Sequence, residues 1–272
     1  MTNLPGSLVR LLPRSARALL KSARFHFRNR GFSPYVSEFE MDGELFRFYV
    51  GDWIGELWYK GGWDQAEIGY LRDRLVQPGD VVFECGAHHG ELTIHLSRWV
   101  GEQGKVIAFE PVPHNMAAVR KQVELNDLKN VTLVNAAVGR ERGRVRITND
   151  SNAEVAGRRG PGIEVEMVRL DDYVQMKPTM LKIDVEGYEA ELLKGAQEVM
   201  RLYPRISLEM HPLSFELYGT SVEEVLALVK AESYQWKMHY SGEREISDYQ
   251  GGKIERRMHL FGLPKAGGPR EG

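Results

Sequence analysis

The sequence predicts an α/β fold in which a mostly parallel sheet of seven strands is covered by helices on both faces. Three observations indicate this fold. From residue 64 onward, short apolar runs alternate with segments of helical apolar spacing, as in repeated βαβ units. Polar residues repeatedly follow the apolar runs, where parallel strands would end. Two late apolar runs, near 234–239 and 257–261, predict an antiparallel terminal hairpin.

The parallel strands and their helices are expected in a regular order. The first strand, at 80–83, follows a Pro-Gly turn. Further parallel strands are expected at 105–109, 131–134, 180–184 and 206–210. Helical apolar spacing is found at 64–75, 91–100, 116–125, 189–200 and 222–231. An added hairpin is expected with strands at 144–148 and 164–168, joined by a mobile loop at 149–162.

Two smaller units are expected before this domain. Residues 1–34 would form a basic helical arm, and residues 35–63 a small antiparallel β unit that serves as a lid or an edge. Asp42-Gly43 lies between two alternating runs and predicts the hairpin turn, with residues 53–59 extending the unit. The main domain would then occupy 64–265, followed by a flexible tail at 266–272.

The arm differs in charge from the rest of the chain. The first 37 residues of the chain contain seven lysines and arginines and no acidic residue. Leucines and phenylalanines are interspersed with these charges, which predicts an amphipathic helix after Pro13. Such a helix can lie on the body of the protein or on an anionic membrane. Peripheral membrane contact through the arm is therefore one expectation for this chain.

Composition excludes several classes of protein. With 42% apolar and 27% charged residues among 272, the chain can bury a large core. Its single cysteine, Cys85, cannot form an internal disulfide, which favours the cytoplasm, with membrane association as a variant. No apolar run approaches the roughly 20 residues of a membrane span. No RNA-binding signature occurs, so no nucleic-acid partner is expected.

The strongest sign of a ligand site is the turn at residues 84–90, which reads Glu-Cys-Gly-Ala-His-His-Gly. Gly86 permits a sharp turn, and Gly90 lets a helix and a ligand approach closely. Glu110 ends the next strand, 20 residues beyond Gly90. A carboxylate at this position can accept hydrogen bonds from both hydroxyls of a ribose.

This pattern suits either NAD or S-adenosylmethionine. A dinucleotide site needs a middle glycine, because a pyrophosphate must approach bare backbone, and residues 87–89 contain no glycine. Glu84, two residues before the first glycine, suits a cofactor that carries an ammonium and a sulfonium group. S-adenosylmethionine is therefore favoured. A nicotinamide-dependent oxidoreductase is the alternative.

The turn is the first of several blocks in a fixed order. The later blocks are Ala108-Phe109-Glu110-Pro111, Leu125-Asn126 with residues 134–139, Leu170-Asp171-Asp172, and residues 181–189. Together they resemble the FkbM family of S-adenosylmethionine-dependent methyltransferases over residues 63–212. The resemblance implies a Rossmann-like class I methyltransferase fold. It also implies O-methylation of a hydroxyl on a small metabolite, a glycan or a polyketide-type acceptor.

The resemblance further implies which residues hold the cofactor. Glu110 would bind the ribose, and Ala136 and Ala137 would border the adenine. The chain departs from the family at His88 and His89, where an asparagine and an aliphatic residue are more usual; His89 is expected to pack as a helix-start residue. The methionine end of the cofactor would lie against five residues of the turn: Glu84, Gly86, Ala87, His88 and Gly90.

The acceptor is expected at the carboxyl ends of the fourth and fifth parallel strands. Methyl transfer to an alcohol requires removal of the hydroxyl proton. Asp184 is the first candidate for the base, followed by Glu209 and His211, whose side chains point to the same side of a strand end. Together with Glu186 these residues can also collect a divalent metal, although a metal-free base is favoured. A membrane-recruited, non-enzymatic cofactor-binding protein is the last alternative.

Overall fold

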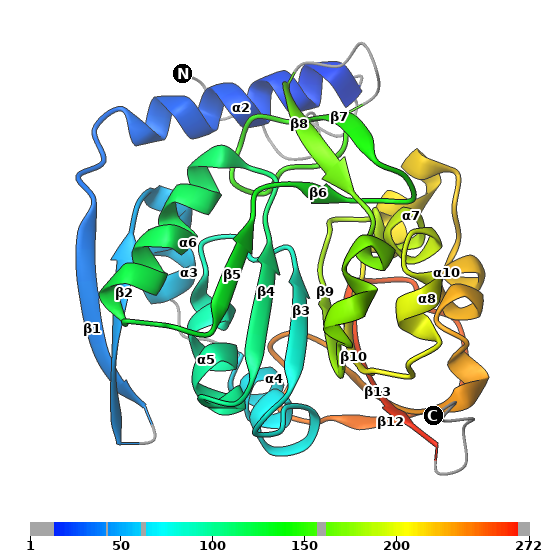
Figure 1. Cartoon of the computed structure of the whole chain (residues 1–272). Helices are drawn as coiled ribbons and strands as arrows, with labels where there is room; N and C mark the ends of the chain where they lie inside the picture. The colour runs from blue at the N-terminus through cyan, green and yellow to red at the C-terminus, as the bar shows by residue number, and fades with distance from the viewer. Residues whose placement is uncertain (1–13, 42, 61–63, 157–161, 266–272) are drawn as a thin grey trace.

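The computed structural model describes residues 14–41, 43–60, 64–156 and 162–265. Its main feature is an eight-stranded sheet with the strand order β12-β11-β13-β10-β9-β3-β4-β5 (Figure 1). The strands are β3 (Val81–Cys85), β4 (Lys105–Phe109), β5 (Val131–Val134), β9 (Met180–Ile183), β10 (Arg205–Met210), β11 (Tyr234–His239), β12 (Ser247–Tyr249) and β13 (Met258–Pro264).

Strand directions confirm the mostly parallel sheet. β5, β4, β3, β9 and β10 are parallel neighbours. β13 runs antiparallel between β10 and β11, so the predicted terminal hairpin is confirmed. All seven predicted strands are present, and the short strand β12 adds an eighth at the edge, where it pairs with β11. Its Ser-Asp-Tyr sequence has no apolar run, which explains why periodicity did not indicate it.

Helices cover both faces of the sheet, because alternate strand residues point to opposite sides. Val82 and Val106 pack on one face, whereas Phe83 and Ile107 pack on the other, and all four are fully buried. The first face is covered by η1 (Leu71–Leu75), α5 (Glu91–Val100) and α6 (Pro113–Leu125). The second face is covered by α7 (Glu189–Lys194), α8 (Gln197–Met200) and α10 (Val222–Leu228).

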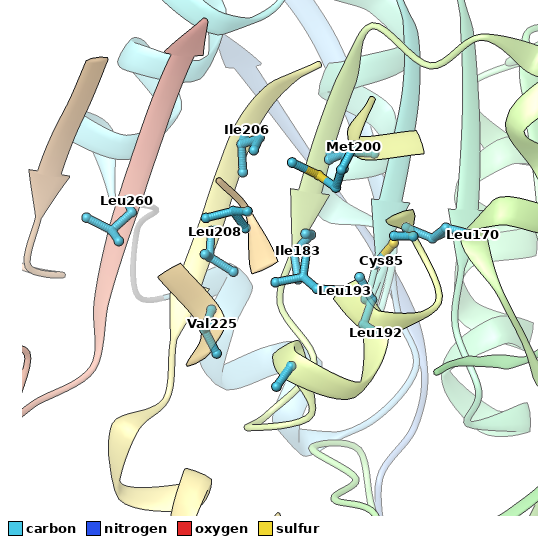
Figure 2. Close-up of a cluster of buried hydrophobic side chains, with 14 of the residues drawn as sticks. Cys85, Leu170, Ile183, Leu192, Leu193, Met200, Ile206, Leu208, Val225 and Leu260 are labelled. Carbon is cyan, nitrogen blue, oxygen red and sulfur yellow. The ribbon is translucent and has the colours of Figure 1, made fainter. Parts of the chain in front are cut away.

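The second face carries the larger core. Figure 2 shows Ile183 and Leu208 of the sheet together with Leu193, Met200 and Val225 of the covering helices. All five side chains are fully buried. At roughly 1.5–3 kcal/mol for each large apolar side chain, this packing holds the strand ends in a fixed arrangement. Polar groups that follow those strands are therefore positioned by a rigid core.

The remaining helices are short and connect the larger elements. The predicted helix at 64–75 appears as α4 (Gln65–Tyr70), which continues into the π-helical η1. Asp64 begins α4, and its side chain accepts a hydrogen bond from the backbone N–H of Glu67. The other short elements are α9 (Pro212–Phe215), η2 (Leu170–Met176), η3 (Glu216–Tyr218) and η4 (Ala231–Ser233).

A small second sheet stands next to the end of β5. Its three strands have the order β6-β8-β7 and comprise β6 (Ala137–Val138), β7 (Gly143–Ile147) and β8 (Ile163–Val168). β7 and β8 are antiparallel, which confirms the added hairpin. Within the loop expected at 149–162, residues 157–161 lie outside the described part of the chain.

An antiparallel hairpin lies beside α6, at one side of the molecule (Figure 1). Its strands are β1 (Tyr35–Met41) and β2 (Glu44–Val50). The expectation that residues 53–59 extend this unit is wrong, because they belong to the helix α3 (Trp53–Lys60). The Asp52 carboxylate accepts a hydrogen bond from the backbone N–H of Gly55, which favours a helix start.

The helix α2 (Arg14–Asn29) crosses the top of the molecule in Figure 1, beside β7 and β8. Phe25 is buried against the ring of His114, and the Lys21 ammonium contacts Asp150 and Glu154. The sequence left open whether this helix lies on the body of the protein or on a membrane. In the structure it lies on the body of the protein, and membrane contact stays a prediction. Residues 1–13 of the arm and the tail at 266–272 lie outside the described residues. Among the described helices, none has the length and apolarity needed to cross a bilayer.

Candidate active site

A cavity of about 920 Å³ opens at the carboxyl ends of β3, β4, β9 and β10. This volume is within the range of small-molecule sites. The cavity is lined by most of the residues that the sequence indicated: Glu84, Gly86, Ala87, His88, Glu110, Ala136, Ala137, Asp184, Glu186 and Glu209. Gly90 and His211 are not part of the lining, but each contacts residues that are.

Loop 84–90 requires glycine at both predicted positions. Gly86 has φ of +90°, and a Cβ atom there would collide with the backbone oxygen of Asp184. Gly90 has φ of +85°, and a Cβ atom there would lie 3.1 Å from Cα of Val119 in α6. Both backbone conformations are strained for any other residue. Gly86 lies between two parts of the cavity: the part lined by loop 84–90 and Glu110, where the sequence predicts the cofactor (the cofactor side), and the part lined by Asp184, Glu186 and Glu209, where it predicts the acceptor (the acceptor side).

Two carboxyl groups, of the buried Glu84 and the half-buried Glu91, line the cofactor side. Glu84 is 1% exposed and accepts a hydrogen bond from the Thr93 hydroxyl over 2.6 Å. Burial raises the pKa of Glu84 to about 7. Burial also raises the pKa of Glu91 to about 8, with a further contribution from the charge of Glu67. A positively charged group in this part of the cavity would stabilise both carboxylates.

Glu110 is fixed by the loop that it faces. One carboxylate oxygen accepts a hydrogen bond from the backbone N–H of His88, and the other accepts from that of Val112, both over 2.8 Å. Burial raises the pKa of Glu110 to about 8, although these hydrogen bonds act in the opposite direction. A carboxyl group offers more than one acceptor position on its oxygens, so Glu110 can still accept a hydrogen bond from a ligand.

A hydrogen-bonded network connects His88 to a residue that the sequence did not indicate. Nδ1 of His88 lies 3.0 Å from Nδ1 of His89, and Nε2 of His89 lies 3.0 Å from the carboxylate of Asp52. His114 donates to the same carboxylate over 2.6 Å. The sequence predicts only a packing role for His89, whereas in the structure His89 is also hydrogen-bonded to Asp52. Asp52 precedes the loop by more than 30 residues, and no motif links the two.

The network has a defined charge state. Burial lowers the pKa of His88 to about 3. Burial acts to raise the pKa of Asp52, but hydrogen bonds from His114 and His89 hold it well below its ordinary value. Asp52 is therefore ionised, and His88 is neutral at neutral pH. A neutral imidazole can donate with one nitrogen and accept with the other.

The expected adenine border lies where β5 continues into β6. Ala136 and Ala137 are 2% and 6% exposed and line the cavity. Asn135, the preceding residue, donates from its side chain to the backbone oxygen of Glu110 over 2.7 Å. The two small apolar side chains therefore line the same cavity as Glu110.

The acceptor side brings together the four residues expected from two strand ends. Nε2 of His211 lies 3.8 Å from Asp184, 3.7 Å from Glu186 and 3.6 Å from Glu209, measured to the nearest carboxylate oxygens. Nδ1 of His211 lies 2.7 Å from Oε1 of the fully buried Glu189. The sequence did not indicate Glu189 as a site residue, because an acidic residue is common in the first turn of a helix.

On the acceptor side, neighbouring charges shift the pKa values of the titratable groups in addition to burial. Burial acts to raise the pKa of Asp184, but the positive charges of Lys182 and His211 hold it below its ordinary value. Burial and the neighbouring Asp184 raise the pKa of Glu209 well above its ordinary value. Burial would lower the pKa of His211, yet the hydrogen bond to Glu189 and the nearby carboxylates raise it to about 9. Asp184 is therefore the candidate that is held most firmly in its ionised form.

The sequence missed three further residues of this side. Lys182 is 6% exposed, and its ammonium lies 3.7 Å from Asp184 and 3.9 Å from Glu67. His259 of β13 lies 3.2 Å from Glu67. A lysine inside an apolar strand was the one available signal, since a buried ammonium needs acidic partners. Glu67 and His259 come from elements remote in sequence and gave no signal.

Known proteins resemble this chain over the region of the site. A family model described as the methyltransferase FkbM domain matches residues 84–236. The chain is 23% identical over 146 residues to "Methyltransferase 1" of Beauveria bassiana (strain ARSEF 2860), and 27% identical over 157 residues to "Methyltransferase sdnD" of Sordaria araneosa. Each match covers 43% of this chain, and 58% and 60% of those relatives respectively. The matched part thus spans less than two thirds of the relatives' length.

Solved structures are also similar to the chain. One is the methyltransferase FkbM from Methylobacillus flagellatus KT, with 18% identity and a TM-score of 0.47. That match covers 71% of this chain and 50% of the other. Another is fibrillarin from Aeropyrum pernix in complex with S-adenosyl-L-methionine, with 14% identity and a TM-score of 0.48, covering 86% of this chain and 85% of that one.

Proposed function

Because the chain belongs to the FkbM methyltransferase family, we propose that it binds S-adenosylmethionine and transfers the methyl group to a hydroxyl oxygen of a small molecule or glycan. One observation carries the proposal. A single cavity is lined on one side by loop 84–90 and Glu110, and on the other by Asp184, Glu186 and Glu209. The first set suits a nucleoside cofactor, and the second suits the removal of a proton.

The cofactor side supports a ligand without phosphates. Loop 84–90 has no glycine between Gly86 and Gly90, so side chains stand where a pyrophosphate would need bare backbone. The carboxyls of Glu84 and Glu91, whose pKa values are raised, favour a positive ligand group. Glu110 would accept hydrogen bonds from the ribose. Ala136 and Ala137 would border the adenine, because their small apolar side chains line the same cavity as Glu110.

The acceptor side supports catalysis by positioning and by a base. Bound S-adenosylmethionine would supply a methyl group that its sulfonium makes electrophilic. Asp184 would accept the hydroxyl proton, because Lys182 keeps its carboxylate ionised. A positioned general base typically contributes 10²–10⁴-fold. Glu209 and His211 would orient the acceptor rather than take the proton, since their raised pKa values favour forms that already carry a proton.

The proposal is tested by labelling. The purified full chain is incubated with methyl-labelled S-adenosylmethionine and pooled small-molecule and glycan acceptors, and products are analysed by mass spectrometry. We expect a label on oxygen, removed by the Asp184→Asn substitution. Label on nitrogen or carbon would contradict the acceptor assignment. No labelled product from a chain that is folded and binds the cofactor would contradict the choice of acceptor class.

A further inference from the structure

The side chain of His211 is placed as a metal ligand would be. It is only 7% exposed, and its Nδ1 is hydrogen-bonded to Glu189 over 2.7 Å. An ionised carboxylate can only accept, so Nδ1 carries the hydrogen. A cation that binds at Nε2 would displace the proton there, and Nε2 would then present a lone pair. Nε2 is buried and has no hydrogen-bond partner among the described residues.

Carboxylates surround this nitrogen at distances that suit a shared cation. Nε2 of His211 lies 3.7 Å from Oε2 of Glu186 and 3.8 Å from Oδ1 of Asp184. These distances are too long for hydrogen bonds. Two ligand atoms that are each about 2.1–2.3 Å from one cation lie roughly 3–4 Å apart. The ligand atoms of Asp184, Glu186 and His211 all lie within 4.8 Å of one another.

Backbone strain and outer contacts support the same site. Glu186 is not a glycine, yet it has φ of +53°, a conformation that costs about 1–3 kcal/mol and is retained mainly at functional positions. Oε1 of Glu189 accepts from His211 and also from the backbone N–H of Gly187. A carboxylate that holds the far nitrogen of a ligating histidine is the usual outer contact of metal sites.

From this arrangement we propose that Asp184, Glu186 and His211 bind a divalent cation, with Glu209 at its edge. Glu209 is less available, because its Oε1 is also 2.9 Å from the guanidinium of Arg257. One imidazole with two or three carboxylates is a mixed ligand set that suits Mn²⁺ and related cations. This proposal departs from the metal-free base that the residue types alone favour.

The cation site deepens the proposed function and rests on it for its role. A cation at this place would bind the acceptor hydroxyl and lower its pKa. Asp184 would bind the cation through Oδ1, while Oδ2, which faces Lys182, stays on the other side of the carboxylate. The acceptor would therefore be a molecule whose hydroxyl can bind a metal, such as a vicinal diol of a sugar.

Direct titration tests the site without S-adenosylmethionine or acceptor. The full chain is treated with chelator, desalted and titrated with Mn²⁺, and free Mn²⁺ is followed by electron paramagnetic resonance. We expect one Mn²⁺ per chain and a Kd about tenfold or more weaker in Glu186→Gln and His211→Gln. Glu243→Gln is the matched control, because Glu243 lines the cavity rim but lies outside the cluster. Its Kd should change less than about twofold, and circular dichroism confirms that each variant is folded.

Either of two results would overturn the cation site. One is the absence of saturable Mn²⁺ binding to the wild-type chain at millimolar concentration. The other is equal weakening in Glu186→Gln and Glu243→Gln, which would indicate general attraction to an acidic cavity. Full methyl transfer in excess chelator would contradict the role of the cation in the reaction while leaving the proposed function intact. Specific Mn²⁺ binding without methyl transfer would contradict the proposed function while leaving the cation site intact.

Discussion

The two sides of the cavity are built in different ways. The cofactor side is formed by short stretches that directly follow strands β3 and β4, and hydrogen bonds between neighbours fix it, as between Glu110 and the backbone of His88. The acceptor side is formed by side chains from β9, β10, β13 and α7, and buried charges hold it together. Substitutions on the two sides should therefore separate binding from chemistry.

The largest effect is expected from Asp184→Asn. Removing the charge should lower the single-turnover rate of methyl transfer by about 10²–10⁴-fold, because the acceptor proton loses its base and its electrostatic partner. The Kd for S-adenosylmethionine should change less than about twofold. Quenched-flow kinetics measures the single-turnover rate, and calorimetric titration measures the Kd. A wild-type rate in a folded variant would remove Asp184 from the chemistry.

Glu110→Gln should give the reverse pattern. An amide accepts ribose hydrogen bonds less well than a carboxylate, and hydrogen bonds to charged groups are worth about 1.5–3 kcal/mol. The Kd for S-adenosylmethionine should therefore rise by about 10–100-fold, with Mn²⁺ binding unchanged. Calorimetry measures the Kd for S-adenosylmethionine, and electron paramagnetic resonance measures Mn²⁺ binding. Equal weakening of both ligands would mean that the two sides are not independent.

Gly90→Ala should reduce stability moderately. The new Cβ would meet α6 at 3.1 Å, and φ of +85° is unfavourable for alanine. We expect a loss of more than about 1 kcal/mol in the free energy of unfolding in urea. Gly69→Ala in α4 is the matched control, because no atom lies within 4 Å of a Cβ there. That substitution should be neutral or stabilise by about 0.5–1 kcal/mol.

The smallest effect is a pH dependence from Asp52. Its pKa is lower in the folded chain than in the unfolded one, so its stabilisation is present above about pH 4 and is lost as the pH falls further. The difference in unfolding free energy between the wild type and Asp52→Asn should shrink by about 1 kcal/mol between pH 5 and pH 3. Asp248→Asn, at an exposed ion pair, is the control. A difference that is constant with pH would contradict the ionised state of Asp52.

The same contrast explains what could be predicted from sequence. The loop at 84–90 and Glu110 follow apolar strands, so periodicity and glycine spacing locate them without knowledge of the tertiary fold. Asp184 and Glu209 were found because they also end strands. The partners Glu67 and His259 were missed, because nothing in the local pattern places β13 beside β10. Residues 53–59 were assigned to the β unit because their aromatic content hid the helical start at Asp52.

Titration of the full chain with S-adenosylmethionine and with NAD⁺ tests the central claim most directly, since it needs no acceptor. The account predicts one molecule of S-adenosylmethionine per chain and no saturable binding of NAD⁺, because loop 84–90 lacks the glycine that a pyrophosphate requires. Binding of NAD⁺ with equal or higher affinity, or no binding of S-adenosylmethionine to the folded chain, would contradict it.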